Sequence, residues 1–117
     1  MILMVSVQNF PESKEADAGG ADIIDVKNLQ EALVGSAEPG LVKQIRDSIS
    51  QPKHVSLTLG VVPNQVGTVA MAVYAAGQIN ATSVKVGFLA TPYNQAVEIL
   101  KASKRDRKST RLNSSHT

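Results

Sequence analysis

The sequence has no cysteine and no tryptophan, and only 3% of its 117 residues are aromatic. Without cysteine the chain can form neither disulfides nor thiolate metal sites, which excludes disulfide-rich scaffolds. Long hydrophobic runs are missing too: no stretch approaches the ~20 apolar residues of a membrane span. The apolar residues 1–7 are too few for a secretory signal and follow no Lys or Arg. We therefore expect a cytoplasmic protein with no membrane partner.

The body of the chain has no excess of positive or negative charge. The formal net charge is +2, but the excess lies at the C-terminal end, where Arg107, Lys108 and Arg111 follow the single acid Asp106. Before Asp106 the acidic and basic residues are equal in number. The neutral body gives no reason to expect a nucleic-acid partner.

The C-terminal segment 106–116, with the sequence DRKSTRLNSSH, reads as the in-frame translation of a common sequencing-adapter oligonucleotide. A natural disordered tail is the alternative, but a match of this length to one oligonucleotide is improbable by chance. We therefore interpret residues 106–117 as a non-native tail and residues 1–105 as the native part of the chain.

What the sequence does contain is a repeated alternation of short apolar runs and segments with helical spacing. The apolar runs have lengths suited to buried parallel strands, and the expected strands are residues 1–7, 21–27, 54–60 and 83–89. A helix signal follows each run; the helices are expected to begin near Pro11, around Pro39, at Thr68 and at Thr91-Pro92. Strands alternating with helices predict an α/β protein with a parallel sheet.

Alternate residues of the expected strands separate into a polar and an apolar set. The polar set is Ser6, Asp25, Lys27, Ser56, Thr58 and Lys85, and the residues between them are almost all apolar. A doubly wound sheet would surround nearly every strand residue with apolar neighbours, whereas a barrel interior turns polar near its C-terminal mouth. The pattern predicts a (βα)8 TIM barrel. Since such a barrel needs ~250 residues, only about its first four βα units are present.

The best candidate site is Lys27, at the end of the second expected strand, with Asp25 two residues earlier on the same face. A neutral lysine can form an imine with a carbonyl substrate, and burial or a nearby cation favours the neutral amine. Lys85, inward-facing on the fourth expected strand, is that cation, whereas Asp25 would hold an ammonium charged; the pattern does not decide which effect is larger. Lysines at strand ends often extend to solvent and have no catalytic role. Burying two ammonium groups in a barrel interior is costly, however, which favours a functional role for this pair.

Other candidates are weaker. The segment GVVPNQVGT (60–68) lacks the lysine and spacing of a Walker motif and is expected to be a βα turn. His54 begins the third expected strand, the end where barrels keep stabilising rather than catalytic residues. The sequence offers no metal cluster and no Ser-His-Asp arrangement, so neither a metal nor a cofactor is expected.

The segment GGADIIDVKN (19–28) resembles the second-strand signature of the (5-formylfuran-3-yl)methyl phosphate synthase family, and MILMVS (1–6), PNQVGT (63–68) and SVKVGF (83–88) match that family in order. The resemblance covers residues 1–105. It implies a barrel enzyme that condenses two glyceraldehyde 3-phosphate molecules, with loss of phosphate and water, to a furan aldehyde phosphate used in methanofuran biosynthesis. It also implies that Lys27 forms the imine and Lys85 transfers the proton. The sequence departs from the family pattern at Leu29, at residues 32–35 and at Val61.

Together these observations predict that the parent gene encodes a Schiff-base lyase for triose phosphates, a homo-oligomer at full length. We expect the 117-residue chain itself to be inactive and poorly soluble, because it leaves strand edges uncovered. Two alternatives stay open: another phosphosugar barrel, such as an aldolase or a thiamine-phosphate-synthase-like enzyme, and a non-catalytic phosphate-binding half-barrel that works as a homodimer.

Overall fold

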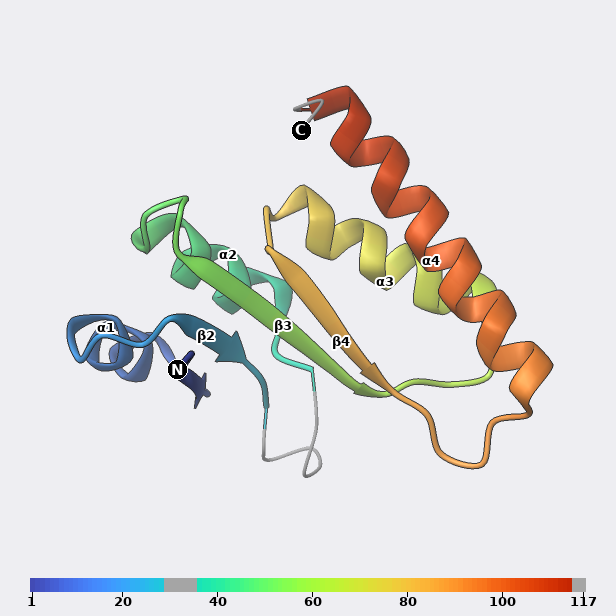
Figure 1. The fold of residues 1–117 in the computed structure, drawn as a ribbon, viewed down its shortest axis with the longest axis horizontal. Coiled ribbons are helices and arrows are strands. Elements are labelled where there is room, and N and C mark those ends of the chain that lie inside the picture. The colour runs from blue at the N-terminus through green and yellow to red at the C-terminus, as the bar shows by residue number, and fades with distance from the viewer. Residues whose placement is uncertain (29–35, 115–117) are drawn as a thin grey trace.

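The computed structural model describes residues 1–28 and 36–114, with side chains as far as Arg105. Four strands form one parallel sheet in the order β1-β2-β3-β4, and a helix follows each strand (Figure 1). The strands are β1 (Met4–Val7), β2 (Ile23–Val26), β3 (His54–Val61) and β4 (Ser83–Gly87). The helices are α1 (Phe10–Ala18), α2 (Pro39–Ser48), α3 (Val66–Gln78) and α4 (Tyr93–Ser114). The expected parallel α/β fold is confirmed, and its consecutive strand order fits part of a barrel.

Several element boundaries differ from those expected. β1 begins at Met4 rather than at residue 1, and β4 ends at Gly87 rather than at residue 89. α1 begins at Phe10 because the Asn9 side chain accepts a hydrogen bond of 2.9 Å from the Glu12 amide, an N-cap that the sequence reading missed. α3 begins at Val66, two residues before the expected start. α4 instead begins at Tyr93, after the expected start at Thr91-Pro92, and β3 extends to Val61 rather than to residue 60, so the boundaries move in both directions.

The C-terminal helix crosses the expected boundary at residue 105, since α4 is helical as far as Ser114. A helical backbone does not distinguish native residues from added ones. The non-native origin of residues 106–117 stays a prediction, and residues 115–117 lie outside the described part of the chain.

The two sets of alternate strand residues lie on opposite faces of the sheet, as expected. Polar residues occupy one row of the register across all four strands: Ser6, Asp25, Ser56 and Ser83. The apolar set faces the helices, where the main core contains Val7, Ile24, Val26, Val55 and Leu57 together with Val42 and Ile45 of α2. A second core joins α3 to α4 through Val69, Val73 and Ile99. The helices therefore cover one face and leave the polar face for the site.

A β-bulge interrupts β3. The register with β4 shifts between Thr58 and Gly60, and Gly60 has a φ of 86°, a backbone conformation that favours glycine. Before the shift, Thr58 stands opposite Lys85. The bulge therefore comes directly after the last polar pair of the two strands, where they approach their C-terminal ends.

A buried arginine stabilises the opposite end of the sheet. The Arg46 side chain, 1% exposed, donates hydrogen bonds to the Thr82 hydroxyl and to three backbone carbonyls of the connection from α2 to β3, those of Ile49, Ser50 and Lys53. Burial lowers the pKa of Arg46 below its usual value, and the nearby charge of Asp47 partly opposes this. The carbonyl acceptors compensate for the lost hydration of the guanidinium.

Lys53 and His54 lie at this same end of β3. The Lys53 ammonium lies 3.3 Å from the Asp17 carboxylate and donates to the Ala21 carbonyl, and His54 Nε2 lies 2.8 Å from the Ser83 hydroxyl. These contacts join the start of β3 to its neighbours, and they lie at the strand end opposite to Lys27.

Candidate active site

The centre of the polar face is the carboxylate of Asp25, which is completely buried. Ser56 donates a hydrogen bond of 2.7 Å to Asp25 Oδ1, and the Thr58 hydroxyl lies 3.0 Å from both carboxylate oxygens. A buried charge needs such partners, because leaving it unpaired in a dry interior is costly. The hydroxyls of β3 therefore stabilise the buried carboxylate on β2.

Two lysines approach the same oxygen of this carboxylate. Lys27 Nζ lies 3.7 Å and Lys85 Nζ lies 3.6 Å from Asp25 Oδ2. The Lys27 side chain is 15% exposed and that of Lys85 is 52% exposed, so Lys27 is the more enclosed of the two amines. The three residues that the sequence singled out as a site are thus brought together from β2 and β4.

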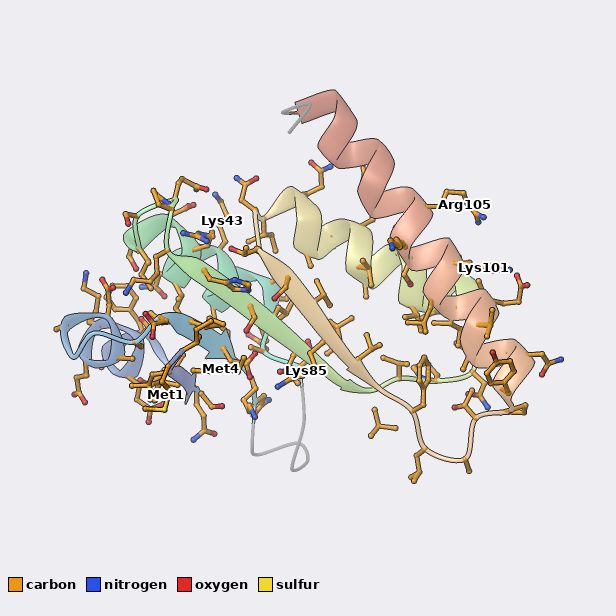
Figure 2. All side chains as sticks on the ribbon, viewed as in Figure 1. Met1, Met4, Lys43, Lys85, Lys101 and Arg105 are labelled. Atoms are coloured by element: carbon orange, nitrogen blue, oxygen red, sulfur yellow. The ribbon has the colours of Figure 1, made fainter. Side chains whose placement is uncertain are left out.

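Strand geometry explains why these side chains meet. Asp25 and Lys27 are two residues apart and so point to the same face. Lys27 follows the last residue of β2, and its amide donates to the Val7 carbonyl at 3.1 Å, which extends the ladder with β1 by one bond. Lys85 stands opposite Thr58 in the register and extends from β4 over β3 toward β2 (Figure 2).

The position of Lys85 differs from that of other cations. Figure 2 shows Lys101 and Arg105 on α4 extending outward from the helix, away from the sheet. Lys85 instead lies over the polar face of the sheet. The local excess of positive charge at the site therefore comes from the strands and not from the helical surface.

Open space lies at the C-terminal ends of β1 and β2, although Lys27 itself does not line it. A cavity of about 350 Å³ opens at the C-terminal ends of β1 and β2 and at the start of α2, and it is lined by Gln8, Asn9, Asn28, Ala37, Glu38 and Leu41. Asn28 directly follows Lys27 in the chain. Small polar substrates bind in such clefts at the C-terminal ends of parallel strands, and this cavity lies at the strand end that carries Lys27.

The segment GVVPNQVGT (60–68) spans the end of β3, the connecting residues 62–65 and the start of α3, and it is engaged in contacts within the protein. The Thr91 hydroxyl donates to the Asn64 side chain at 2.7 Å, and the Gln95 side chain donates to the Asn64 carbonyl at 2.8 Å. These bonds tie the β3–α3 turn to the β4–α4 turn. The expectation of a βα turn is confirmed at this segment.

The hydroxyls of Ser56 and Thr58 are functional candidates that the sequence reading did not assign to the site. Both belong to the polar set of alternate strand residues, which was the available signal. Their contact with Asp25 depends on the pairing of β2 with β3, which places Ser56 directly opposite Asp25. The departures from the family pattern at Leu29 and residues 32–35 lie outside the described residues, whereas Val61 ends β3 and is exposed.

Residues 1–28 and 36–114, the described ranges, contain neither a metal-binding group nor a membrane-spanning helix. No group of three or more His, Cys, Asp or Glu side chains in them could hold a metal ion. No helix in them is long and apolar enough to cross a membrane.

Fold and site together define a parallel α/β protein with two lysines and a buried aspartate on the polar face of its sheet. The chain belongs to the 4-HFC-P synthase family, because the model of that family matches residues 3–115. It is 45% identical over 102 residues to the (5-formylfuran-3-yl)methyl phosphate synthase of Methanocaldococcus jannaschii, and 42% identical to those of Methanococcus maripaludis strain C5 and Methanobrevibacter smithii. Each match covers 86% of this chain but 43% of the relative. The chain therefore spans less than half the length of these relatives.

Proposed function

We propose that the whole protein to which this chain corresponds is a Schiff-base lyase that makes (5-formylfuran-3-yl)methyl phosphate from two molecules of glyceraldehyde 3-phosphate, releasing one phosphate and two waters, for methanofuran biosynthesis. The observation that carries the proposal is the meeting of Lys27 and Lys85 at one oxygen of the Asp25 carboxylate. The names of the relatives supply the product.

The first step is imine formation at Lys27. Its neutral amine attacks the aldehyde carbon of one triose phosphate, a C–N bond forms, and the carbonyl oxygen leaves as water. The resulting iminium withdraws electrons, so the proton on the neighbouring carbon becomes acidic. Removing that proton sends the C–H electron pair into an enamine, which expels phosphate from the third carbon and restores the iminium. The resulting three-carbon unit then supplies the carbon nucleophile for the second triose.

Lys85 is the proposed group for this proton transfer. Its amine lies near Lys27 through their shared contact with Asp25 Oδ2, and its partial exposure lets it exchange protons with water. Asp25 orients both amines and compensates for their charge. The reaction thus needs two lysines of different roles, one enclosed and one open to solvent.

The whole protein is proposed to be a (βα)8 barrel and a homo-oligomer. Four consecutive parallel βα units fill about half of such a barrel, and the relatives are more than twice as long as the matched segment. We expect the 117-residue chain to form the imine without completing the condensation, because residues for the second substrate would come from later strands.

The test is reductive trapping of the imine. The chain is incubated with glyceraldehyde 3-phosphate and cyanoborohydride, and peptide mass spectrometry compares labelling at each lysine. We expect Lys27 to be labelled at least about tenfold faster than Lys43, whose side chain is 67% exposed and which reports non-specific reaction. Lys27→Arg should abolish the adduct at that position without changing the labelling of Lys43.

Equal labelling of Lys27 and Lys43 in both this chain and a full-length version would sink the Schiff-base role. Saturable binding of triose phosphate by a soluble dimer without any adduct would instead support the phosphate-binding half-barrel. Resequencing the locus beyond codon 105 tests the non-native tail: natural coding sequence that continues in frame with residues 106–117 would contradict it.

A further inference from the structure

The contacts of Asp25 differ in length according to the type of partner. Its hydroxyl partners lie at 2.7 and 3.0 Å, but the nitrogens of Lys27 and Lys85 stay at 3.7 and 3.6 Å. A charge-assisted bond between an ammonium and a carboxylate usually has a length of about 2.7–2.9 Å. Neither lysine therefore makes a closed ion pair with this carboxylate.

A surface pair in the same molecule shows what a closed contact looks like. Lys43 Nζ lies 2.8 Å from Asp47 Oδ2, and no hydroxyl competes for that carboxylate in the described structure. At Asp25 the hydroxyls occupy the short-contact positions: Oδ1 accepts from Ser56, and Thr58 lies between both oxygens. The distance between ammonium and carboxylate is thus longer where hydroxyls bond to the carboxylate and shorter where none does.

We propose that Ser56 and Thr58 are positioning residues that hold the Asp25 carboxylate and keep it from closing onto either lysine. The hydroxyls fix its orientation and compete for its lone pairs, so the ammonium form of Lys27 is stabilised less than a closed ion pair would stabilise it. The neutral amine needed for carbonyl attack is then reached at lower pH. The inference rests on the proposed role of Lys27, and it assigns a function to two residues of β3 that act through Asp25.

All four strands contribute to the surroundings of the carboxylate. Among the residues that the structure describes, the charged groups within 4 Å of Asp25 are Lys27, directly after β2, and Lys85 on β4. β3 contributes only hydroxyls, and the β1 residue in register with Asp25 is Ser6, which carries no charge. Glu38, at the start of α2, lines the neighbouring cavity and is the acid of that wall.

The experiment compares Thr58→Val, which keeps the shape but removes the hydroxyl, with Thr58→Ser, which restores it. Trapping of triose phosphate at Lys27 is measured across a pH series. In Thr58→Val the pH of half-maximal trapping should rise by about half to one unit, because the freed carboxylate closes on the ammonium. Thr58→Ser should return to the wild-type value. Ser56→Ala should shift in the same direction, and it replaces Thr58→Val if that variant fails to fold.

The matched control is Ser103→Ala. Ser103 on α4 is also a buried serine, but its hydroxyl has no hydrogen-bond partner and it lies away from Asp25. Its loss should leave the pH profile of trapping unchanged. A shift of equal size in this variant would mean that any loss of a buried hydroxyl moves the profile, and it would overturn the proposal.

A second readout separates this inference from the proposed function. The Cε signals of Lys27 and Lys85 are followed by NMR over pH without any substrate, with assignments from Lys27→Arg and Lys85→Arg. In Thr58→Val the midpoint pH of the Cε signal change of Lys27 or Lys85 should rise, even if the wild type forms no imine. Absence of the imine would reject only the proposed lyase function. Unchanged or lowered transitions in folded Thr58→Val and Ser56→Ala would overturn the positioning role.

Discussion

Lys85 Nζ lies 3.6 Å from Asp25 Oδ2 although β4 and β2 are not neighbours in the sheet. Between Lys85 and Asp25 the intervening strand β3 carries the short side chains of Ser56 and Thr58, and both bond to the same carboxylate. Small residues between the two strands thus leave room for a long amine to cross. This relationship joins the proposed proton-transfer group to the proposed imine site.

Replacing the anion should favour the neutral amine at Lys27. In Asp25→Asn the side-chain shape is kept, but the charge that stabilises the ammonium forms of Lys27 and Lys85 is lost. The pH of half-maximal imine trapping should therefore fall by about one unit, opposite in sign to the effect of Thr58→Val. Trapping measured from neutral to alkaline pH checks this. An upward shift in a folded variant would contradict the placement of Asp25 as the compensating charge.

Removing the second amine should separate imine formation from proton transfer. Lys85→Gln keeps a polar side chain but cannot accept the proton, so the adduct at Lys27 should persist. Exchange of deuterium from solvent into the carbon next to the imine should slow by about 10²–10⁴-fold. Mass spectrometry of the trapped adduct in D₂O measures both quantities, and Lys101→Gln, on the outer face of α4, is the matched control. Undiminished exchange in Lys85→Gln would assign the proton transfer to another group.

The buried guanidinium of Arg46 should contribute strongly to stability. Arg46→Met fills similar volume but leaves the carbonyls of Ile49, Ser50 and Lys53 without this donor. We expect the free energy of unfolding to fall by about 2–4 kcal/mol. Urea denaturation followed by circular dichroism measures the change. Lys43→Ala, which breaks an exposed ion pair on the same helix, should cost less than about 1 kcal/mol.

The charge of Arg46 should add no pH dependence near neutrality. Because burial lowers the pKa of Arg46, the folded state binds this proton less tightly than the unfolded state does. Burying the charged guanidinium therefore lowers the free energy of unfolding at every pH below the folded pKa of Arg46. This loss is relieved only as the pH rises through that pKa. The loss in Arg46→Met should thus be constant between about pH 6 and 9. A steep change in that range would point to a different titrating partner.

The uncovered edges of the sheet should cause self-association. Within residues 1–28 and 36–114, β1 pairs with β2 alone, and Met4 on this strand is 48% exposed. We expect Met4→Lys to weaken association by about tenfold, near 1.4 kcal/mol, because the charge resists burial against a second edge. Light scattering over a concentration series measures it. Met71→Lys places the same charge at a methionine of α3 that is 68% exposed, and an equal effect there would show that the edge is not the contact.

Element types and the polar face were predictable because strand geometry is local. Side chains alternate with period two, so Asp25, Ser56, Thr58 and Lys85 could be placed on one face before any pairing was known. The ends of the elements were less predictable. Asn9 caps α1 through its side chain, and the bulge next to Gly60 arises only when β3 pairs with β4.

The residues of the candidate site, Lys27, Lys85 and Asp25, could thus be chosen from the sequence by itself, since strand periodicity and the family signature both depend on residues close together in the chain. Their mutual distances depend on register between strands that are far apart in sequence. Only the tertiary structure decided that both amines meet one oxygen of Asp25 and that hydroxyls from β3 hold the shorter contacts. Hydrogen bonding inside a buried cluster is a property of packed neighbours, and no single strand carries it.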